Sequence, residues 1–344
     1  MSFPEYLNET AIQVEYQLQE YTKKRWSDLI NKYPITNDLI SAFVNSCEWW
    51  KRLRAVLVKL WYDIANWNPS KNIYIPAIGV EIFQTAILAH DDIIDKSDLR
   101  RGKPTLYKSL WWDHYGISQT ICLGDIWLLL AARTMIEWED FSDEIKVRAS
   151  SHFIEMIINT WIGEMIDVKL PTLTNPWYEE IISVCKLKTA EYTINTPIKL
   201  GALFAWRSDD QLKVFDNFAI NLWIAFQIKD DILWIYGDSK STWKANYDDI
   251  IEWKKTLLRL WAHDHMTNDQ KNKRNNIYGN SKVTESDIIY IRDIIWLSGA
   301  HEYAISEMQK YANLAKNSIT QITQNPIYIW LLEDFVNLMI NRNK

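Results

Sequence analysis

Two pairs of adjacent aspartates are the residues of this chain whose type and spacing most directly suggest chemistry. The first pair lies in the segment His90–Asp95, and Arg100 and Arg101 follow it. On a helix Asp91 and Asp95 are one turn apart on the same face, where like charges destabilise each other unless a cation lies between them. Carboxylates are ligands that Mg²⁺ takes together with phosphates, and arginines bind phosphates through two donors at once. A solvated acidic turn followed by a basic one fits the same residues.

A second pair, Asp230 and Asp231, lies inside an apolar stretch that contains Gln227. Aspartate is rarely placed on a largely buried segment unless it is paired or bound to a metal. Two such pairs on two helices of an all-helical protein suggest carboxylate clusters that face each other around a shared cavity.

Basic residues lie before, between and after the two acidic segments. A single lysine is more often a solvated surface residue than a ligand. Several of them beside metal-binding aspartates would instead form a site for a polyanion, with the metal on one side and the cations on the other. The residues concerned are Lys51, Arg52 and Arg54, then Lys188 with Thr189, then Lys244, Lys254 and Lys255 with Thr256.

The elements that must position these residues are helices. Val80, Phe83, Ile87 and Ile94 recur at helical spacing, and residues 153–166, 215–236 and 288–315 behave likewise. Alternating apolar and polar runs are scarce and hairpin signals are absent, so a sheet is not expected. The pattern predicts one all-α domain of long packed helices over residues 1–344, with the polar stretch 266–286 as an exposed loop.

Composition narrows the class of protein. The 344 residues are 48% hydrophobic and 24% charged, with a formal net charge of −6, which argues against nucleic acid as the main partner. The three cysteines share no metal-ligand spacing and fit a reducing cytoplasm. The N-terminal residues do not resemble a signal peptide, and no stretch of 18 apolar residues occurs, so we expect no membrane span.

With these motifs in this order, the chain resembles the trans-isoprenyl diphosphate synthases of the polyprenyl synthetase family, from about Trp49 to about Thr256. The segment from Asp91 to Gly102 resembles the first aspartate-rich motif, and Lys51–Arg54 resembles a Gly-Gly-Lys-Arg-Leu-Arg motif. The second aspartate motif has Trp234 at the position where the commonest form has aspartate. Gly124-Asp125, Lys188-Thr189, Phe226-Gln227-x-x-Asp230-Asp231 and Gly237-Asp238 also match the family pattern.

The resemblance implies a bundle of mostly antiparallel helices around a central cavity, in a cytoplasmic homodimer. It implies Mg²⁺, three ions in all, and condensation of isopentenyl diphosphate head to tail with an allylic diphosphate. The roles that it implies are as follows: Asp91, Asp95 and Asp230 as Mg²⁺ ligands, supported by Asp92 and Asp231; Arg100, Lys188, Lys244 and Lys254 on the allylic diphosphate; Lys51, Arg54, Gln84 and Arg101 on isopentenyl diphosphate; and Thr189 and Gln227 as further substrate-binding residues.

Bulk beneath the first motif sets the product length in this family. Ile87 and Ala86 stand four and five residues before Asp91, and neither is aromatic, whereas Phe83 lies one turn deeper. We therefore expect the cavity to extend past a C15 product and to close near C20 at Phe83.

Other functions remain open at this point. A terpene cyclase also pairs an aspartate motif with a helical cavity, but it usually lacks the basic residues that bind a second diphosphate. A catalytically impaired homologue or a silent partner subunit is a further alternative, although a silent subunit would normally have lost one aspartate motif. A di-iron bundle needs Glu-x-x-His pairs, which the sequence does not contain.

The tryptophan content is anomalous. The chain has 19 Trp beside 9 Gly, whereas a chain of this length would carry about 24 Gly. Indoles in place of helix-contact glycines would overpack the core by about 1–3 kcal/mol each. We therefore expect that the gene uses UGA codons for glycine and that these codons were translated as tryptophan in this sequence. Deliberate engineering and an inactive tryptophan-rich homologue are the alternatives. The family has glycine at the positions of Trp49, Trp50, Trp223, Trp243 and Trp253, and some members have it at the position of Trp234. Further candidates are Trp61, Trp112, Trp127, Trp161, Trp206 and Trp261. No such match exists for Trp26 and Trp330.

Overall fold

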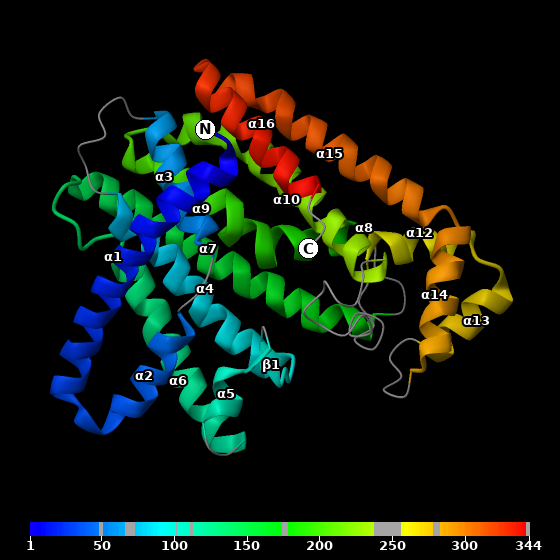
Figure 1. The fold of residues 1–344 in the computed structure, drawn as a ribbon, viewed down its shortest axis with the longest axis horizontal. Coiled ribbons are helices and arrows are strands. Elements are labelled where there is room, and N and C mark those ends of the chain that lie inside the picture. Colours follow the sequence, from blue (N-terminus) through cyan, green and yellow to red (C-terminus); the bar gives the residue numbers. More distant parts are fainter. Residues whose placement is uncertain are drawn as a thin grey trace. The chain divides into compact units, whose positions relative to one another are not determined.

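The computed structural model describes residues 1–47, 51–65, 73–100, 102–110, 113–173, 178–236, 256–277 and 283–341. These residues form helices with one short strand pair (Figure 1), so the all-α prediction is confirmed. Several residues singled out above lie outside the described residues: Trp49, Trp50, Arg101, Trp112, Gly237, Asp238, Trp243, Lys244, Trp253, Lys254 and Lys255.

The helices follow one another with short connections. Their bounds are α1 (Phe3–Lys32), η1 (Pro34–Thr36), α2 (Asn37–Ser46), α3 (Leu53–Ala65), α4 (Tyr74–Ile94), α5 (Leu106–Ser109), α6 (Asp113–Arg133), α7 (Asp143–Lys169), η2 (Leu170–Thr172), α8 (Tyr178–Val184), the π-helical segment η3 (Cys185–Asn195), α9 (Thr196–Phe204), α10 (Asp209–Tyr236), α12 (Leu257–His265), α13 (Asn268–Ile277), α14 (Glu285–Leu297), α15 (Ala300–Ile322) and α16 (Pro326–Asn341).

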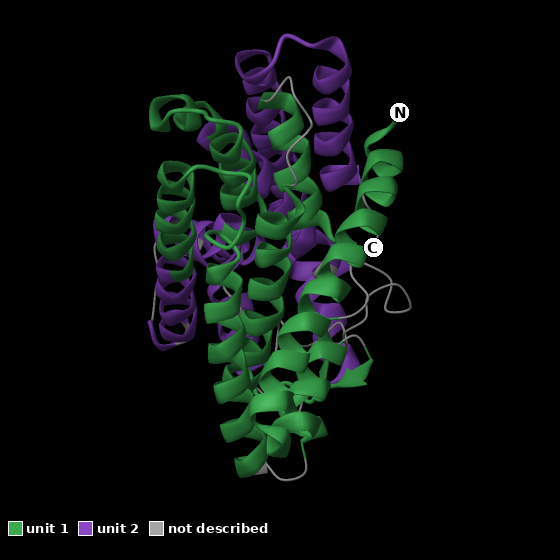
Figure 2. Ribbon diagram, turned by 90° about the vertical axis from the view of Figure 1, so that its left-hand side faces the viewer, with its two compact units in different colours: residues 1–157, 192–215 green, residues 158–191, 216–344 purple. Residues whose placement is uncertain are grey.

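Contacts divide the chain into two compact units (Figure 2). Unit 1 comprises residues 1–157 and 192–215, and unit 2 comprises residues 158–191 and 216–344. The prediction of a single domain over 1–344 stays a prediction. Each unit has its own buried apolar residues, such as Phe83 in unit 1 and Phe335 in unit 2.

Helix α4 is the central helix of unit 1. Nearly all its residues from Ile75 to His90 are buried, and it packs against α1, α3, α6 and α9. The contact between α3 and α9 is backbone to backbone, because a Cβ added to Gly201 would lie 2.3 Å from the Val58 carbonyl oxygen. α3 is thereby held between α9 and α4.

The buried carboxylate of Glu81 ties the start of α3 to α4. Its Oε1 accepts a hydrogen bond from the Ala55 backbone N–H at 3.1 Å, in the first turn of α3 where such donors lack helical partners. Its Oε2 lies 3.8 Å from Arg52 Nη1. Arg52 also donates from Nε to Glu15 Oε2 at 2.6 Å and from Nη2 to the Cys47 carbonyl at 2.7 Å. One network therefore joins α1, α2, α3 and α4.

In unit 2, α15 packs against α12, α14 and α16. Trp261 of α12 stacks on Tyr303 of α15, with 3.9 Å between the ring centroids, and its indole N–H donates to the Ser298 carbonyl at 3.1 Å. The helical stretch expected at 288–315 is broken at Gly299, where φ is +74°, so that α14 ends and α15 begins.

Two local expectations were wrong. Residues 268–277 of the predicted loop form α13, which begins with a capping box: Thr267 Oγ1 accepts from the Gln270 N–H, and Gln270 Oε1 accepts from the Thr267 N–H. A small hairpin also exists, in which β1 (Leu99–Arg100) pairs antiparallel with β2 (Lys103–Pro104). Gly102, with φ +75°, permits the turn between them.

Helix α6 has an unusually apolar surface. The segment His114–Arg133 is long and apolar enough to cross a membrane, judged by length and composition alone. Only 33% of an apolar 18-residue stretch within it is buried inside the protein. Exposed apolar residues on its surface include Tyr115, Ile126 and Leu129.

We predict that Glu81→Ala lowers the free energy of unfolding by about 3 kcal/mol, because it removes the acceptor of the Ala55 N–H and a buried partner of Arg52. Urea unfolding followed by circular dichroism measures the change. The matched control is Glu307→Ala, which removes an ion pair with the exposed Lys310 within α15 and should cost less than about 1 kcal/mol. Equal losses in the two variants would contradict the anchoring role of Glu81.

Candidate functional site

The first aspartate motif forms the C-terminal end of α4. Asp91 and Asp92 belong to the helix and Asp95 is its C-cap. The helix stops because Lys96 adopts φ +54° and the N–H groups of Lys96 and Ser97 bond back to the carbonyls of Ile93 and Asp92. The predicted alignment of the two outer aspartates is therefore present at the helix end.

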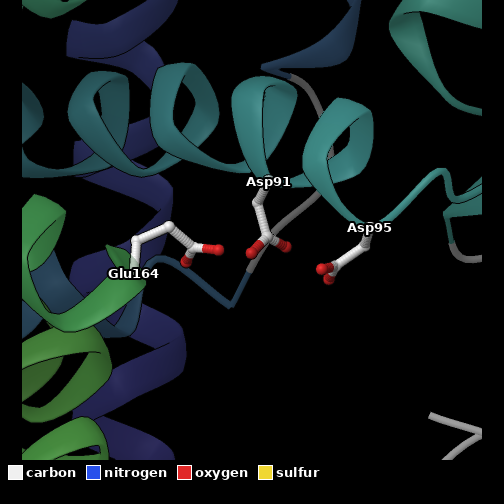
Figure 3. A group of neighbouring side chains, drawn as sticks. All are labelled: Asp91, Asp95 and Glu164. Atoms are coloured by element: carbon white, nitrogen blue, oxygen red, sulfur yellow. The ribbon is translucent and has the colours of Figure 1, made fainter. Parts of the chain in front are cut away.

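Asp91 and Asp95 offer oxygens to the same small volume. Their ligand oxygens lie within 4.8 Å of each other, and Figure 3 shows both side chains projecting to the same side of α4. Asp91 is half-buried and Asp95 is exposed. Because Mg²⁺ binds oxygen at about 2.1 Å, a small side-chain rotation would bring both carboxylates onto one ion.

Arg100 of β1 compensates the charge of this motif. Its Nε donates to Asp92 Oδ1 at 2.8 Å, and its Nη2 donates to Asp91 Oδ2 at 3.1 Å. Burial lowers the pKa of Arg100. The hydrogen bond to Asp92 and the negative charges of Asp92 and Asp91 raise the pKa by more than burial lowers it, so the net shift is upward. The hairpin thus places a permanently charged guanidinium beside the two adjacent carboxylates.

His90 fixes the last turns of α4 against α6. Its Nε2 lies 3.2 Å from the Ile121 carbonyl and 3.5 Å from Asp125 Oδ1. The ring fits only because residue 124 is glycine, since a Cβ there would lie 2.6 Å from the imidazole. The Gly124-Asp125 motif therefore leaves room for His90, the residue before Asp91, and holds its ring in place.

The basic motif at the start of α3 is split between two environments. Lys51 is exposed. Arg54 donates from Nη2 to Thr193 Oγ1 at 3.0 Å, and its guanidinium carbon lies 4.9 Å from the centre of the Tyr192 ring. Arg52, which separates them, is the buried anchor described above.

Gln84 and Phe83 lie on the buried surface of α4. Gln84 is 3% exposed, and its Oε1 is buried without a hydrogen-bond partner among the described residues. The Phe83 ring meets Phe153 and Tyr192 edge to face, with centroid distances of 5.9 and 5.6 Å. Ala86 and Ile87, one turn nearer to Asp91, are buried as well: Ala86 0% and Ile87 6% exposed.

The second aspartate motif lies on α10, in unit 2. Asp231 is 6% exposed and accepts a hydrogen bond from Gln227 Nε2 at 3.3 Å, whereas Asp230 is half-buried. Trp223, one turn before Gln227, is buried and packs on Phe226 with 4.7 Å between the ring centroids. The predicted partial burial of this acidic pair is present.

Lys188 and Thr189 lie in the π-helical segment η3, and both are half-buried. Lys188 Nζ is 2.8 Å from Glu164 Oε2 and 2.7 Å from Asp167 Oδ2, two residues of α7 that the sequence analysis did not identify. The signal that could have found them is a pair of acidic residues at i and i+3 directly after Gly163.

The comparisons with known proteins agree with these motifs. The sequence model of the family described as Polyprenyl synthetase matches residues 44–295. The chain belongs to the polyprenyl synthetase family. It is 29% identical over 318 residues to the geranylgeranyl diphosphate synthase of Saccharolobus solfataricus, covering 92% of this chain and 91% of that protein.

Two further relatives support the assignment. The geranylfarnesyl diphosphate synthase of Aeropyrum pernix is 32% identical over 279 residues, covering 79% of this chain and 83% of that one. The geranylgeranyl pyrophosphate synthase structure from Corynebacterium glutamicum, solved with isoprenyl diphosphate and magnesium, matches with a TM-score of 0.84 at 26% identity, covering 99% and 98% of the two chains. This polyprenyl synthetase is therefore a prenyltransferase of isoprenoid biosynthesis, with the isoprenoid synthase fold.

The polyprenyl synthetase thus carries two sets of site residues, one in each unit. Unit 1 brings Asp91, Asp92, Asp95 and Arg100 together. Unit 2 brings Lys188 beside Glu164 and Asp167, and Gln227 beside Asp231. Arg101, Lys244 and Lys254 lie outside the described residues, and the substrate roles of all these residues stay predictions.

We predict that Gly124→Ala lowers the prenyltransferase activity at least tenfold and destabilises the fold by about 1–3 kcal/mol, since the new methyl group collides with the His90 ring. Adding His90→Ala should restore stability but not activity, because the collision disappears while the support of Asp91 is still lost. Unfolding and steady-state kinetics on the two single variants and the double variant give the coupling. Simple additivity of the two stability losses would show that Gly124 does not seat His90.

Proposed function

We propose that the polyprenyl synthetase condenses isopentenyl diphosphate with an allylic diphosphate head to tail and releases a prenyl diphosphate of about C20. The observation that carries this proposal is the length of the match to a geranylgeranyl diphosphate synthase, 92% of the chain. The acidic and basic motifs of both units lie within the matched family segment, residues 44–295, and supply the groups that two diphosphates require.

The donor set fits Mg²⁺. All ligands proposed from the sequence are carboxylates, which are hard oxygen donors, and the Asp91 and Asp95 oxygens are near enough to share an ion. We assign Asp91, Asp95 and Asp230 as the protein ligands of Mg²⁺, three ions in all, with Asp92 and Asp231 in support. When bound, the metal supplies positive charge to the leaving diphosphate. A relative's structure is described as a complex with isoprenyl diphosphate and magnesium.

The chain's own residues bind and orient the two substrates. Arg100, Lys188, Lys244 and Lys254 hold the allylic diphosphate, and both aspartate motifs serve that same diphosphate. Lys51, Arg54, Gln84 and Arg101 hold isopentenyl diphosphate, with Thr189 and Gln227 completing the site. The buried Gln84 amide and the Arg54 Nε, neither of which is fully bonded among the described residues, are groups that a ligand oxygen would satisfy.

The allylic chain extends along the buried surface of α4 in this proposal. In this proposal, Ala86 and Ile87 line the part of the cavity nearest Asp91. Phe83 closes the far end of the cavity and packs against Phe153 and Tyr192. These side chains are apolar or aromatic, so they exclude water from the carbocation that ionisation produces. Product length then depends on the ring of Phe83.

We further propose that the enzyme is a cytoplasmic homodimer. The exposed residues Tyr115, Cys122, Ile126 and Leu129 follow one another on α6 at steps of seven, four and three, and so form a largely apolar stripe that the exposed Asp125 interrupts. A second copy would cover this stripe, since exposed apolar side chains gathered on one helix face mark interaction surfaces. The three cysteines, all within the described residues, are free thiols.

Incubation with Mg²⁺, isopentenyl diphosphate and C5, C10 or C15 allylic diphosphates tests the function. We expect a C20 diphosphate as the main product by chromatography after dephosphorylation, and no product when a chelator removes the metal. Absence of elongation both from the chain as written and from a chain with glycine at the suspected tryptophan positions would contradict the proposal.

We predict that Phe83→Ala lengthens the product beyond C20, because the shortened side chain opens the wall between Phe153 and Tyr192. Truncating a buried phenylalanine also costs about 3–5 kcal/mol of stability, so Phe83→Leu is measured beside it and should give a smaller shift in the same direction. Phe335→Leu, a buried change in unit 2, is the control that keeps the product length. An unchanged product length in both Phe83 variants would contradict the proposal that Phe83 limits the product length.

We predict that Leu129→Arg converts the dimer to a monomer in sedimentation velocity, because it places a charge in the apolar stripe of α6. Leu314→Arg, at an exposed leucine of α15, is the matched control and should leave the dimer intact. A Leu129→Arg protein that sediments as the parent does would place the interface elsewhere.

A further inference from the structure

Lys188 lies between two carboxylates of α7. Glu164 Oε2 is 2.8 Å from its Nζ and Asp167 Oδ2 is 2.7 Å from it. Glu164 is 6% exposed, whereas the Asp167 side chain is 39% exposed. A largely buried carboxylate is thus held against the lysine that we assign to the allylic diphosphate.

Backbone packing fixes this arrangement. A Cβ added to Gly163 would lie 2.2 Å from the Lys188 backbone nitrogen, so the backbones of α7 and η3 are in direct contact at this point. Glu164 follows Gly163 directly, and Asp167 is one turn further along the same helix. The lysine therefore meets both carboxylates because two backbones touch, rather than through a chance side-chain conformation.

The charges have a consequence for binding. One ammonium group is in contact with two carboxylates, so a bare diphosphate that approaches Lys188 is also repelled by Glu164 and Asp167. A diphosphate that carries a divalent cation does not meet this barrier. We propose that Glu164 is a positioning residue that holds Lys188 and makes its contact with diphosphate depend on the accompanying cation. This inference rests on the proposed role of Lys188.

Calorimetric titration with inorganic pyrophosphate, with and without Mg²⁺, tests the proposal. Glu164→Gln keeps the shape and a hydrogen-bond acceptor but removes the charge. We expect it to bind pyrophosphate about tenfold more tightly without Mg²⁺ and to gain about tenfold less from Mg²⁺ than the parent. Glu307→Gln, which neutralises the partner of Lys310 on α15, is the control and should change neither affinity.

The outcomes separate this proposal from the proposed function. If Lys188→Ala weakens pyrophosphate binding while Glu164→Gln leaves both affinities unchanged or weaker, the positioning role of Glu164 is overturned and that of Lys188 stands. If Lys188→Ala changes nothing, the assignment of Lys188 to diphosphate fails and takes the role of Glu164 with it.

A separate set of observations concerns the tryptophans. Trp206 directly follows the C-cap of α9 and has φ +68°. Its N–H bonds to the Leu203 carbonyl at 2.9 Å, and the Arg207 N–H bonds to the Ala202 carbonyl at 3.0 Å. These two bonds define a Schellman motif, in which the left-handed residue is usually glycine. Gly299, with φ +74°, follows the C-cap of α14 in the same way.

A bulky residue at this point is strained. A left-handed backbone is a genuine outlier for bulky side chains because the Cβ crowds the adjacent carbonyl. The Trp206 side chain lies largely at the surface, with the residue 55% exposed, so burial does not compensate for that strain. Glycine would adopt the same backbone without it.

Two buried tryptophans have a different defect. Trp127 is 0% and Trp223 3% exposed, and the indole N–H of each is buried without an acceptor among the described residues. Buried indoles usually find such an acceptor, and a missing one is unfavourable. Trp26 has the same defect, but it lines a cavity of about 200 Å³ that has room for a bonded water.

Other tryptophans are well accommodated. The indole N–H of Trp138 donates to Asp140 Oδ2 at 2.8 Å. Trp261, one of the candidates in the sequence, donates to the Ser298 carbonyl and stacks on Tyr303 and His265. Hydrogen bonding and backbone conformation therefore separate Trp127, Trp206 and Trp223 from Trp138 and Trp261.

We infer that residues 127, 206 and 223 are glycine in the natural protein, encoded by UGA, and that Trp138 and Trp261 are genuine. This division agrees with the composition, in which 19 Trp stand beside 9 Gly. It moves Trp261 out of the set that the sequence suggested and gives Trp206 the strongest structural support. Glycine at 223 would also remove a buried ring one turn from Gln227.

The gene sequence and the mass of the natural protein test the inference. We expect UGA at codons 127, 206 and 223, UGG at 138 and 261, and glycine at the first three positions in peptide mass spectra. In the chain as written, Trp206→Gly should raise the melting temperature, whereas Trp261→Gly should lower it. UGG at the three codons, or a Trp206→Gly variant that melts below its parent, would overturn the inference.

Discussion

The site of unit 1 depends on the buried carboxylate of Glu81. It satisfies a backbone donor at the start of α3 and attracts Arg52, whose guanidinium also binds α1 and the end of α2. The basic motif begins in that same turn, so Arg54 is held at a set place relative to α4. Because α4 also carries Gln84 and Asp91, one buried anion fixes the distance between the groups that we assign to isopentenyl diphosphate and those that we assign to the metal.

The end of α4 concentrates negative charge at the place where a helix favours it least. The C-terminus of a helix has a partial negative charge, so aspartates there are unfavourable without compensation. Arg100 supplies part of the compensating positive charge through hydrogen bonds to Asp91 and Asp92. The hairpin that carries Arg100 begins shortly after the C-cap of α4. Binding of a cation would compensate the rest, which explains how a charge arrangement that weakens the isolated helix is retained in the enzyme.

Sequence pattern was enough where function depends on one helix. The spacing of Asp91 and Asp95, with Phe83 earlier on the same helix, follows directly from the helical period, and all three are found on α4 as expected. Pattern was insufficient where two backbones must touch. Glu164 and Asp167 meet Lys188 only because α7 and η3 pack at Gly163, and nothing in the spacing between residues 164 and 188 predicts that contact. The capping box that starts α13 was present in the sequence but was hidden by the low apolar content of that stretch.

The retained glycines indicate what this fold requires of the others. Gly124 admits the His90 ring, Gly163 admits the backbone at Lys188, and Gly201 admits that of α3; a single added carbon would collide at each. Helices in this protein therefore approach one another more closely than ordinary side chains allow, and they do so beside the functional residues. In a fold built on such contacts, an indole in place of glycine either strains the backbone, as at Trp206, or leaves a buried N–H without an acceptor among the described residues, as at Trp127 and Trp223. The excess of tryptophan and the shortage of glycine then have a common origin in how one codon is read, and glycine at positions 127, 206 and 223 would remove each of these defects.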